Sequence, residues 1–108
     1  IKPSELAPRM AEELAKAIEE SFAPEVVSVI TGGVEVAEAF SSLPFDHILF
    51  TGSTRVGKMV MRAAAENLTP VTLELGGKSP VIIDEGFAVE RAVESILSGK
   101  LLNSGQTC

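Results

Sequence analysis

The sequence lacks tryptophan and tyrosine altogether, and it has one cysteine and one histidine among its 108 residues. A single cysteine cannot form a disulfide within the chain, so we expect a reducing, cytoplasmic setting. Acidic residues outnumber basic ones by 15 to 9, and the net charge of −6 disfavours a nucleic-acid backbone as partner. No apolar run approaches the length that crosses a membrane, and no group of potential ligands has metal-site spacing.

What is present is the composition of a globular domain, with 45% hydrophobic residues. Amphipathic stretches of helical period alternate with short β-branched apolar runs. Helices are expected over residues 4–22, 34–40, 54–67 and 88–102, and strands over residues 26–30, 47–50, 71–75 and 81–83. This alternation predicts an α/β fold of the Rossmann-like kind, a parallel sheet with helices on both faces.

The start of the first helix admits two interpretations. Ser4 has the side chain of an N-cap residue, and Glu5 would then lie in the positive first turn. Pro8 is either tolerated early in that helix or marks a later true start.

Three turns of small residues follow expected strands. They are Thr31-Gly32-Gly33, Thr51-Gly52-Ser53 and Glu74-Leu75-Gly76. Ligands of parallel sheets bind beyond the carboxyl ends of the strands, so we expect the three turns along one edge.

The segment from Gly52 to Lys58 nearly spells a phosphate-binding loop, but Met59 stands where a hydroxyl should reach a magnesium ion. A nucleoside-triphosphatase is therefore disfavoured. A small-residue turn that leads into a helix N-terminus still accepts a phosphate group. The alternative is a helix start capped by Ser53 or Thr54 without any ligand, and the turn alone leaves both open.

Two side chains carry candidate chemistry. Glu74 follows an apolar strand and precedes two glycines, so apolar surroundings and a flexible turn would suit it to act as a general base. Cys108 is a candidate nucleophile. The alternatives are a solvated loop glutamate and an inert buried thiol. His47 begins a strand at the opposite end, and we interpret it as structural.

Four motifs, Lys2-Pro3-Ser4-Glu5 and the segments 50–57, 73–80 and 105–108, occur together and in the order typical of one family. The chain resembles the aldehyde dehydrogenase superfamily over its whole length. Segments 43–47 and 65–72 are most similar to the coniferyl aldehyde and fatty aldehyde dehydrogenase branch.

The resemblance implies NAD(P)-dependent oxidation of an aldehyde to a carboxylic acid. Cys108 matches the thiolate that attacks the aldehyde, giving a thiohemiacetal and then a thioester. Glu74 matches the base that activates water for thioester hydrolysis. Covalent catalysis of this kind divides one difficult reaction into two easier steps, the oxidation and the hydrolysis.

The resemblance also assigns cofactor contacts. Lys2 and Glu5 match residues that bind the adenosine ribose, where a carboxylate repels a 2′-phosphate and so favours NAD, with NADP still open. The other matched positions are Ser53 at the pyrophosphate, Val56 at adenine, Thr51 and the Leu75 backbone beside the nicotinamide, and Gly52 and Gly57 in the turn.

The resemblance implies an internal fragment that ends at the catalytic cysteine. Residues 1–75 would belong to the cofactor-binding domain, and residues 76–108 would begin the catalytic domain. The parent is expected to be a homodimer or homotetramer acting on a small-molecule aldehyde, and the isolated fragment to be nearly inactive. The alternative functions are a non-catalytic nucleotide- or phosphate-binding module and a structural α/β fragment with an inert thiol.

Overall fold

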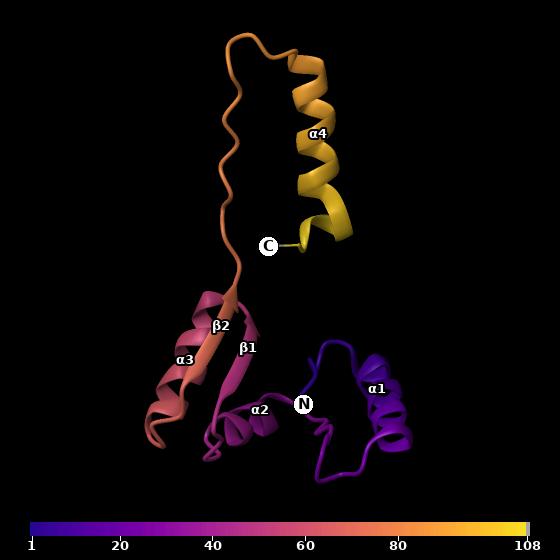
Figure 1. The fold of residues 1–108 in the computed structure, drawn as a ribbon, viewed down its shortest axis with the longest axis vertical. Helices are drawn as coiled ribbons and strands as arrows, with labels where there is room; N and C mark the ends of the chain where they lie inside the picture. Colours follow the sequence, from indigo (N-terminus) through magenta and orange to yellow (C-terminus); the bar gives the residue numbers. More distant parts are fainter. Residues whose placement is uncertain (108) are drawn as a thin grey trace.

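The computed structural model describes residues 1–107 and has mixed α/β architecture (Figure 1). Its elements in chain order are α1 (Pro8–Ser21), α2 (Val34–Ser41), β1 (Ile48–Gly52), α3 (Thr54–Ala65), β2 (Val71–Leu75), α4 (Val89–Leu101) and the short turn η1 (Leu102–Gly105). The expected fold class is confirmed, and β2 has the bounds that the apolar run predicted.

The centre of the molecule is a strand–helix–strand unit. Strands β1 and β2 are parallel neighbours, and their register runs from Ile48 opposite Val71 to Gly52 opposite Leu75. Helix α3 connects the strands and packs on one face of the sheet (Figure 1). The core of this unit consists of Ile48, Val60 and Ala64, with Phe45, Phe50, Val56 and Val71 packed around them.

A buried glycine determines how closely α3 approaches the sheet. A Cβ atom on Gly57 would lie 2.9 Å from Cδ2 of Leu75 and 3.7 Å from Cδ1 of Leu73. Because glycine has no side chain, β2 leucines occupy the space beside the helix backbone. The structure therefore gives Gly57 a packing role, in addition to the cofactor contact that the resemblance implies.

Polar side chains fasten the loops at the amino ends of the strands. The Asn67 Nδ2 group donates to the carbonyl of Ser42 at 2.8 Å, and the Thr69 hydroxyl donates to the carbonyl of Phe45 at 2.9 Å. Thr69 is the one buried polar residue among those described. These bonds hold the entry to β1 beside the entry to β2, so the register is fixed from that end.

Two predicted strands do not form ladders. Residues 26–30 begin in a turn, where the N–H groups of Val26 and Val27 donate to the carbonyl of Ala23. The rest of the segment bonds to Ile1, whose ammonium donates to the carbonyl of Ser28 and whose carbonyl accepts from Ile30. Residues 81–83 are exposed and have no ladder partner among residues 1–107. Both predictions were wrong because a strand needs a neighbour of comparable length, which periodicity does not supply.

The first helix begins later than Ser4. Its flanking residue is Ala7, and Pro8 occupies the first turn. The Ser4 hydroxyl instead accepts from the backbone N–H of Leu6 at 3.2 Å, in a turn before the helix. Of the two interpretations of Pro8, the later start is correct, since proline at the first helical position gives up no intrahelical bond.

The molecule is open. Its radius of gyration is 18.7 Å, against about 13 Å for a closed domain of this length. Helix α4 and the extended segment before it stand apart from the central unit (Figure 1). The sheet face opposite α3 exposes 70% of Leu49. None of the described helices combines the length and the apolar character needed to cross a membrane.

Replacing Gly57 with valine is expected to destabilise the protein by about 1–3 kcal/mol, because the new side chain would overlap Leu75. The matched control is Gly99→Val in α4, where a Cβ atom meets nothing within 4 Å. Thermal unfolding measures both, and equal midpoints for the two variants would contradict the packing argument.

Candidate functional site

The carboxyl edge of the sheet brings two of the three small-residue turns together. Thr51 lies opposite Glu74, and Gly52 lies opposite Leu75, as neighbours on parallel strands. Thr51 and Glu74 are exposed, on the face that α3 does not cover. The edge therefore presents a hydroxyl and a carboxylate side by side, next to the turn that starts α3.

The start of α3 is a capped helix N-terminus. Ser53 has extended backbone, and its hydroxyl accepts from the backbone N–H of Val56 at 3.3 Å. The sequence left two alternatives for this turn, a capped helix start and a phosphate site, and the structure shows the cap. The two are compatible, because the first N–H groups of a helix have no intrahelical partners and one cap satisfies only one of them.

At Gly52 the Phe50 ring packs where a side chain would lie. The Gly52 φ of 157° is unfavourable for residues with a Cβ atom, and such an atom would lie 2.7 Å from the ring of Phe50. Gly52 and Ser53 are both exposed, so the backbone before Ser53 is accessible from solvent. Val56, on the first turn of α3, is half-buried against the core, so only part of its side chain is available for contact.

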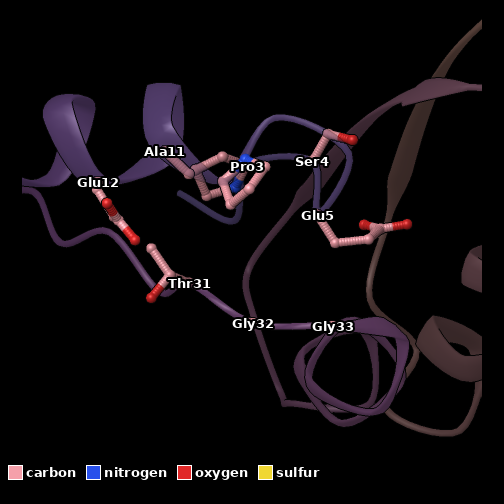
Figure 2. A pocket seen from close by; sticks show the side chains of 9 residues that line it. Pro3, Ser4, Glu5, Ala11, Glu12, Thr31, Gly32 and Gly33 are labelled. Carbon is pink, nitrogen blue, oxygen red and sulfur yellow. The ribbon is translucent and has the colours of Figure 1, made fainter.

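The third turn lies elsewhere, against the N-terminal segment. Thr31, Gly32 and Gly33 line a hollow of about 400 Å³ together with Pro3, Ser4, Glu5, Pro8, Ala11 and Glu12 (Figure 2). We call this the N-terminal hollow. In the view of Figure 2 the carboxylates of Glu5 and Glu12 lie on opposite sides of Pro3. The volume is in the range of small-molecule sites.

Lys2 and Glu5 form an ion pair beside the N-terminal hollow. The Lys2 ammonium lies 3.2 Å from the Glu5 carboxylate, and 10% of the Lys2 side chain is exposed against 41% for Glu5. A hydrogen bond from the backbone amide of Glu5 itself, followed by the Lys2 ammonium, lowers the pKa of the Glu5 carboxyl. Glu5 is therefore held as a carboxylate, ready to accept hydrogen bonds from ligand hydroxyl groups.

Glu74 does not have the apolar surroundings that its strand predicted. It points to the exposed side of β2, while its neighbours Leu73 and Leu75 pack toward α3. The alternation of β2 explains this, because successive side chains of a strand point to opposite faces. His47, at the other end of the sheet, contacts the Thr72 hydroxyl at 3.0 Å, away from the carboxyl edge.

Cys108 lies outside the described residues. The preceding residues Asn103, Ser104 and Gly105 have φ values of 51°, 58° and 72°. This left-handed run favours glycine and asparagine. Further back, the Lys100 ammonium donates to the carbonyl of Ser79 at 2.9 Å, which ties α4 to the extended segment after β2.

Sequence reasoning did not assign Glu12 or the turn at residues 31–33 to the site. The turn was recognised, but it was expected at the edge of the sheet rather than against Glu5. Glu12 gave no local signal, because an exposed glutamate on an amphipathic helix is ordinary. Only the folding of α1 back over Pro3 places it at the N-terminal hollow.

The chain was compared with known proteins. The family profile described as "Aldehyde dehydrogenase family" matches residues 1–108. The chain is 55% identical to a probable coniferyl aldehyde dehydrogenase of Caulobacter vibrioides, covering 100% of this chain and 22% of that protein. It is 53% identical to a 4,4'-diaponeurosporen-aldehyde dehydrogenase of Staphylococcus aureus, covering 100% of this chain and 24% of that protein.

The solved structures that resemble this chain are also aldehyde dehydrogenases. The substrate-bound Staphylococcus aureus AldH has a TM-score of 0.93 and 52% identity, covering 99% of this chain and 23% of that one. A Mycobacterium tuberculosis aldehyde dehydrogenase complexed with NAD+ has a TM-score of 0.87 and 42% identity, with the same coverage of 99% and 23%. This sequence thus spans about a quarter of the length of the relatives it matches.

The Lys2–Glu5 pair predicts a pH dependence of stability. Because folding lowers the pKa of Glu5, the unfolded chain binds more protons on acidification. The stability from this carboxylate is present above about pH 4.3, the ordinary glutamate pKa, and is lost as the pH falls through the lowered value. Glu5→Gln is expected to flatten the acid limb of unfolding free energy against pH. Glu13→Gln is the control, and identical acid limbs for Glu5→Gln and the unmodified protein would contradict the prediction.

Proposed function

This chain belongs to the aldehyde dehydrogenase family, and on that premise we propose that it is part of an NAD(P)-dependent enzyme that oxidises an aldehyde to a carboxylic acid. The observation that carries the proposal is the parallel register, which sets Glu74 beside Thr51 directly before the capped start of α3. A candidate base and a candidate phosphate-binding turn thereby share one edge of the sheet. Residues 1–75 would supply the cofactor-binding part, and residues 76–108 the beginning of the catalytic part.

The described residues fit a dinucleotide. The exposed backbone at Gly52 and the N–H groups at the start of α3 suit a pyrophosphate. The Lys2–Glu5 pair at the N-terminal hollow suits the hydroxyls of an adenosine ribose. Thr51 and the Leu75 backbone would lie toward the nicotinamide, and Val56 toward the adenine. When bound, the nicotinamide supplies the acceptor for the hydride of the aldehyde.

Glu5 favours NAD over NADP, because a carboxylate at the ribose repels a 2′-phosphate. Relatives of both kinds lie close to this chain. One solved relative is an NAD+ complex, and a canine relative that is 49% identical is described as dimeric and NADP-preferring. We propose NAD as the preferred cofactor and a dimer or tetramer as the assembly of the whole protein.

Cys108 and Glu74 would perform the covalent chemistry. The Cys108 thiolate adds to the aldehyde carbon, and a carbon–sulfur bond forms as the carbonyl oxygen takes up the negative charge. After oxidation the acyl group is held as a thioester on Cys108. Glu74 then takes a proton from water, which attacks the thioester and releases the carboxylic acid and the thiol. The exposure of Glu74 on its strand gives water direct access to it.

The names of the relatives guide the choice of substrate. They include a coniferyl aldehyde dehydrogenase and a 4,4'-diaponeurosporen-aldehyde dehydrogenase. We propose a bulky, apolar aldehyde as the substrate class of the whole protein. A panel that ranges from short aliphatic to aromatic and polyene aldehydes tests this directly.

Cys108→Ala in the full-length protein is expected to abolish aldehyde-dependent reduction of NAD. Glu74→Gln is expected to lower turnover by about 10²- to 10⁴-fold, because only the hydrolysis of the thioester loses its base. A stopped-flow burst of reduced nicotinamide, followed by slow steady turnover, is the expected signature of Glu74→Gln.

Lys58→Ala is the matched control, since Lys58 is exposed on α3 and belongs to the incomplete phosphate-binding loop. It should leave turnover within about twofold of the unmodified protein, as expected of an exposed surface substitution. Full activity of Cys108→Ala, or a loss in Lys58→Ala equal to that in Glu74→Gln, would contradict the proposed function.

A further inference from the structure

Helix α4 returns alongside the extended segment that leads to it. Figure 1 shows the helix and residues 76–87 side by side and running in opposite directions. Ser79 in the extended segment and Thr107 beyond η1 line one hollow of about 380 Å³, together with Lys100 at the end of α4. The hollow therefore brings the chain after β2 close to the chain after η1.

Lys100 contacts the chain on both sides of this hollow. Its ammonium donates to the carbonyl of Ser79 at 2.9 Å, across 21 residues of sequence. Among residues 1–107 this is the only side-chain hydrogen bond that joins α4 to the extended segment. The backbone carbonyl of Lys100 lies 3.3 Å from the position that a Cβ atom of Gly105 would take. One residue thus links the extended segment to the turn that follows α4.

The turn after α4 is held tightly against Lys100. Gly105 has a φ of 72°, which is the left-handed region that favours glycine. A side chain there would also crowd the Lys100 carbonyl. Gly105 comes shortly before Cys108, and Ser79 comes shortly after Glu74. Because so few residues intervene on either side, a tie between Ser79 and Lys100 limits how far apart Glu74 and Cys108 can lie.

We propose that Lys100 is a positioning residue for the oxidation of the aldehyde, which sets the separation of the chain segments that carry Glu74 and Cys108. This inference rests on the proposed function, because it takes those two residues as the base and the nucleophile. Lys100 acts through backbone atoms of Ser79 and Gly105, so no proton transfer is assigned to it. A misplacement of about 1 Å at a reacting group costs about 10²-fold in rate, so one bond of this kind matters for turnover.

The test compares variants of the full-length protein. Lys100→Met removes the donor and keeps a side chain of similar length. It is expected to lower the turnover of aldehyde by about 10- to 100-fold. The KM for NAD should stay within about twofold, because the proposed dinucleotide contacts lie on other elements. Lys100→Arg keeps a cationic donor and is expected to retain turnover within about threefold of the unmodified protein.

Arg91→Met is the matched control, because Arg91 is also an exposed cation of α4 and forms no side-chain hydrogen bond among the described residues. Its turnover should stay within about twofold of the unmodified protein. A loss in Arg91→Met as large as that in Lys100→Met would overturn the inference. So would unchanged turnover in Lys100→Met, or an equal loss in Lys100→Arg and Lys100→Met.

The double variant with Glu74→Gln separates positioning from a general weakening of the structure. If Lys100 acts by placing Glu74 relative to Cys108, Lys100→Met should cost less than about threefold once the Glu74 base is absent. The same fold-loss in both backgrounds would overturn the inference and leave the proposed function standing. Aldehyde oxidation that persists in Cys108→Ala would reject the proposed function itself.

Discussion

The parallel pairing of β1 with β2 is the constraint on which the rest of the structure depends. It places Glu74 level with Thr51 and Leu75 level with Gly52. The register is held at the other end by the Asn67 and Thr69 bonds, and from one face by α3. A slip of one residue would turn Glu74 toward the helix and a leucine toward solvent. The chemistry proposed for this edge thus follows from packing and hydrogen bonds that lie within residues 42–75.

A second theme is the use of short-range electrostatics at exposed positions. Exposed pairs contribute little to stability, yet the Lys2–Glu5 pair lies beside the N-terminal hollow, where the proposed ribose would bind. The Lys2 side chain is mostly buried, whereas the Glu5 side chain is partly exposed. The Lys2 ammonium therefore orients the Glu5 carboxylate and is less available to attract an anion. Under the proposed function, the pair would contribute selectivity between ligands of different charge more than stability of the fold.

Sequence reasoning located what local physics determines. The apolar run of β2 and the helix that follows Gly52 depend on near neighbours, and both were predicted. The cap was narrowed to Ser53 or Thr54, and the structure has Ser53. Residues 26–30 and 81–83 have strand-like sequences but lack long partners, so the ladder could not be inferred from them alone. The exposure of Glu74 could not be predicted from the sequence alone. It depends on which face of the sheet α3 covers, because only the residues of β2 on that face are shielded from solvent. The place of Glu12 and of the turn at residues 31–33 depends on α1 folding back, which no motif encodes.

The contrast between the central unit and the remaining segments has a physical cause. Residues 42–75 close a small core within one continuous stretch of the chain, so the loop that must be closed is short and its entropy cost is modest. The exposed face of the sheet, the segment 76–87 and the outer face of α4 carry apolar side chains that find no cover among residues 1–107. The relatives that this chain matches are about four times as long, and apolar surface of this extent ordinarily marks a contact with further protein. The proposed function therefore depends on two levels of organisation. The strand register places the Glu74 carboxylate through local packing, whereas the path from Leu75 through α4 has apolar faces without cover among residues 1–107 and so depends on partners distant in sequence.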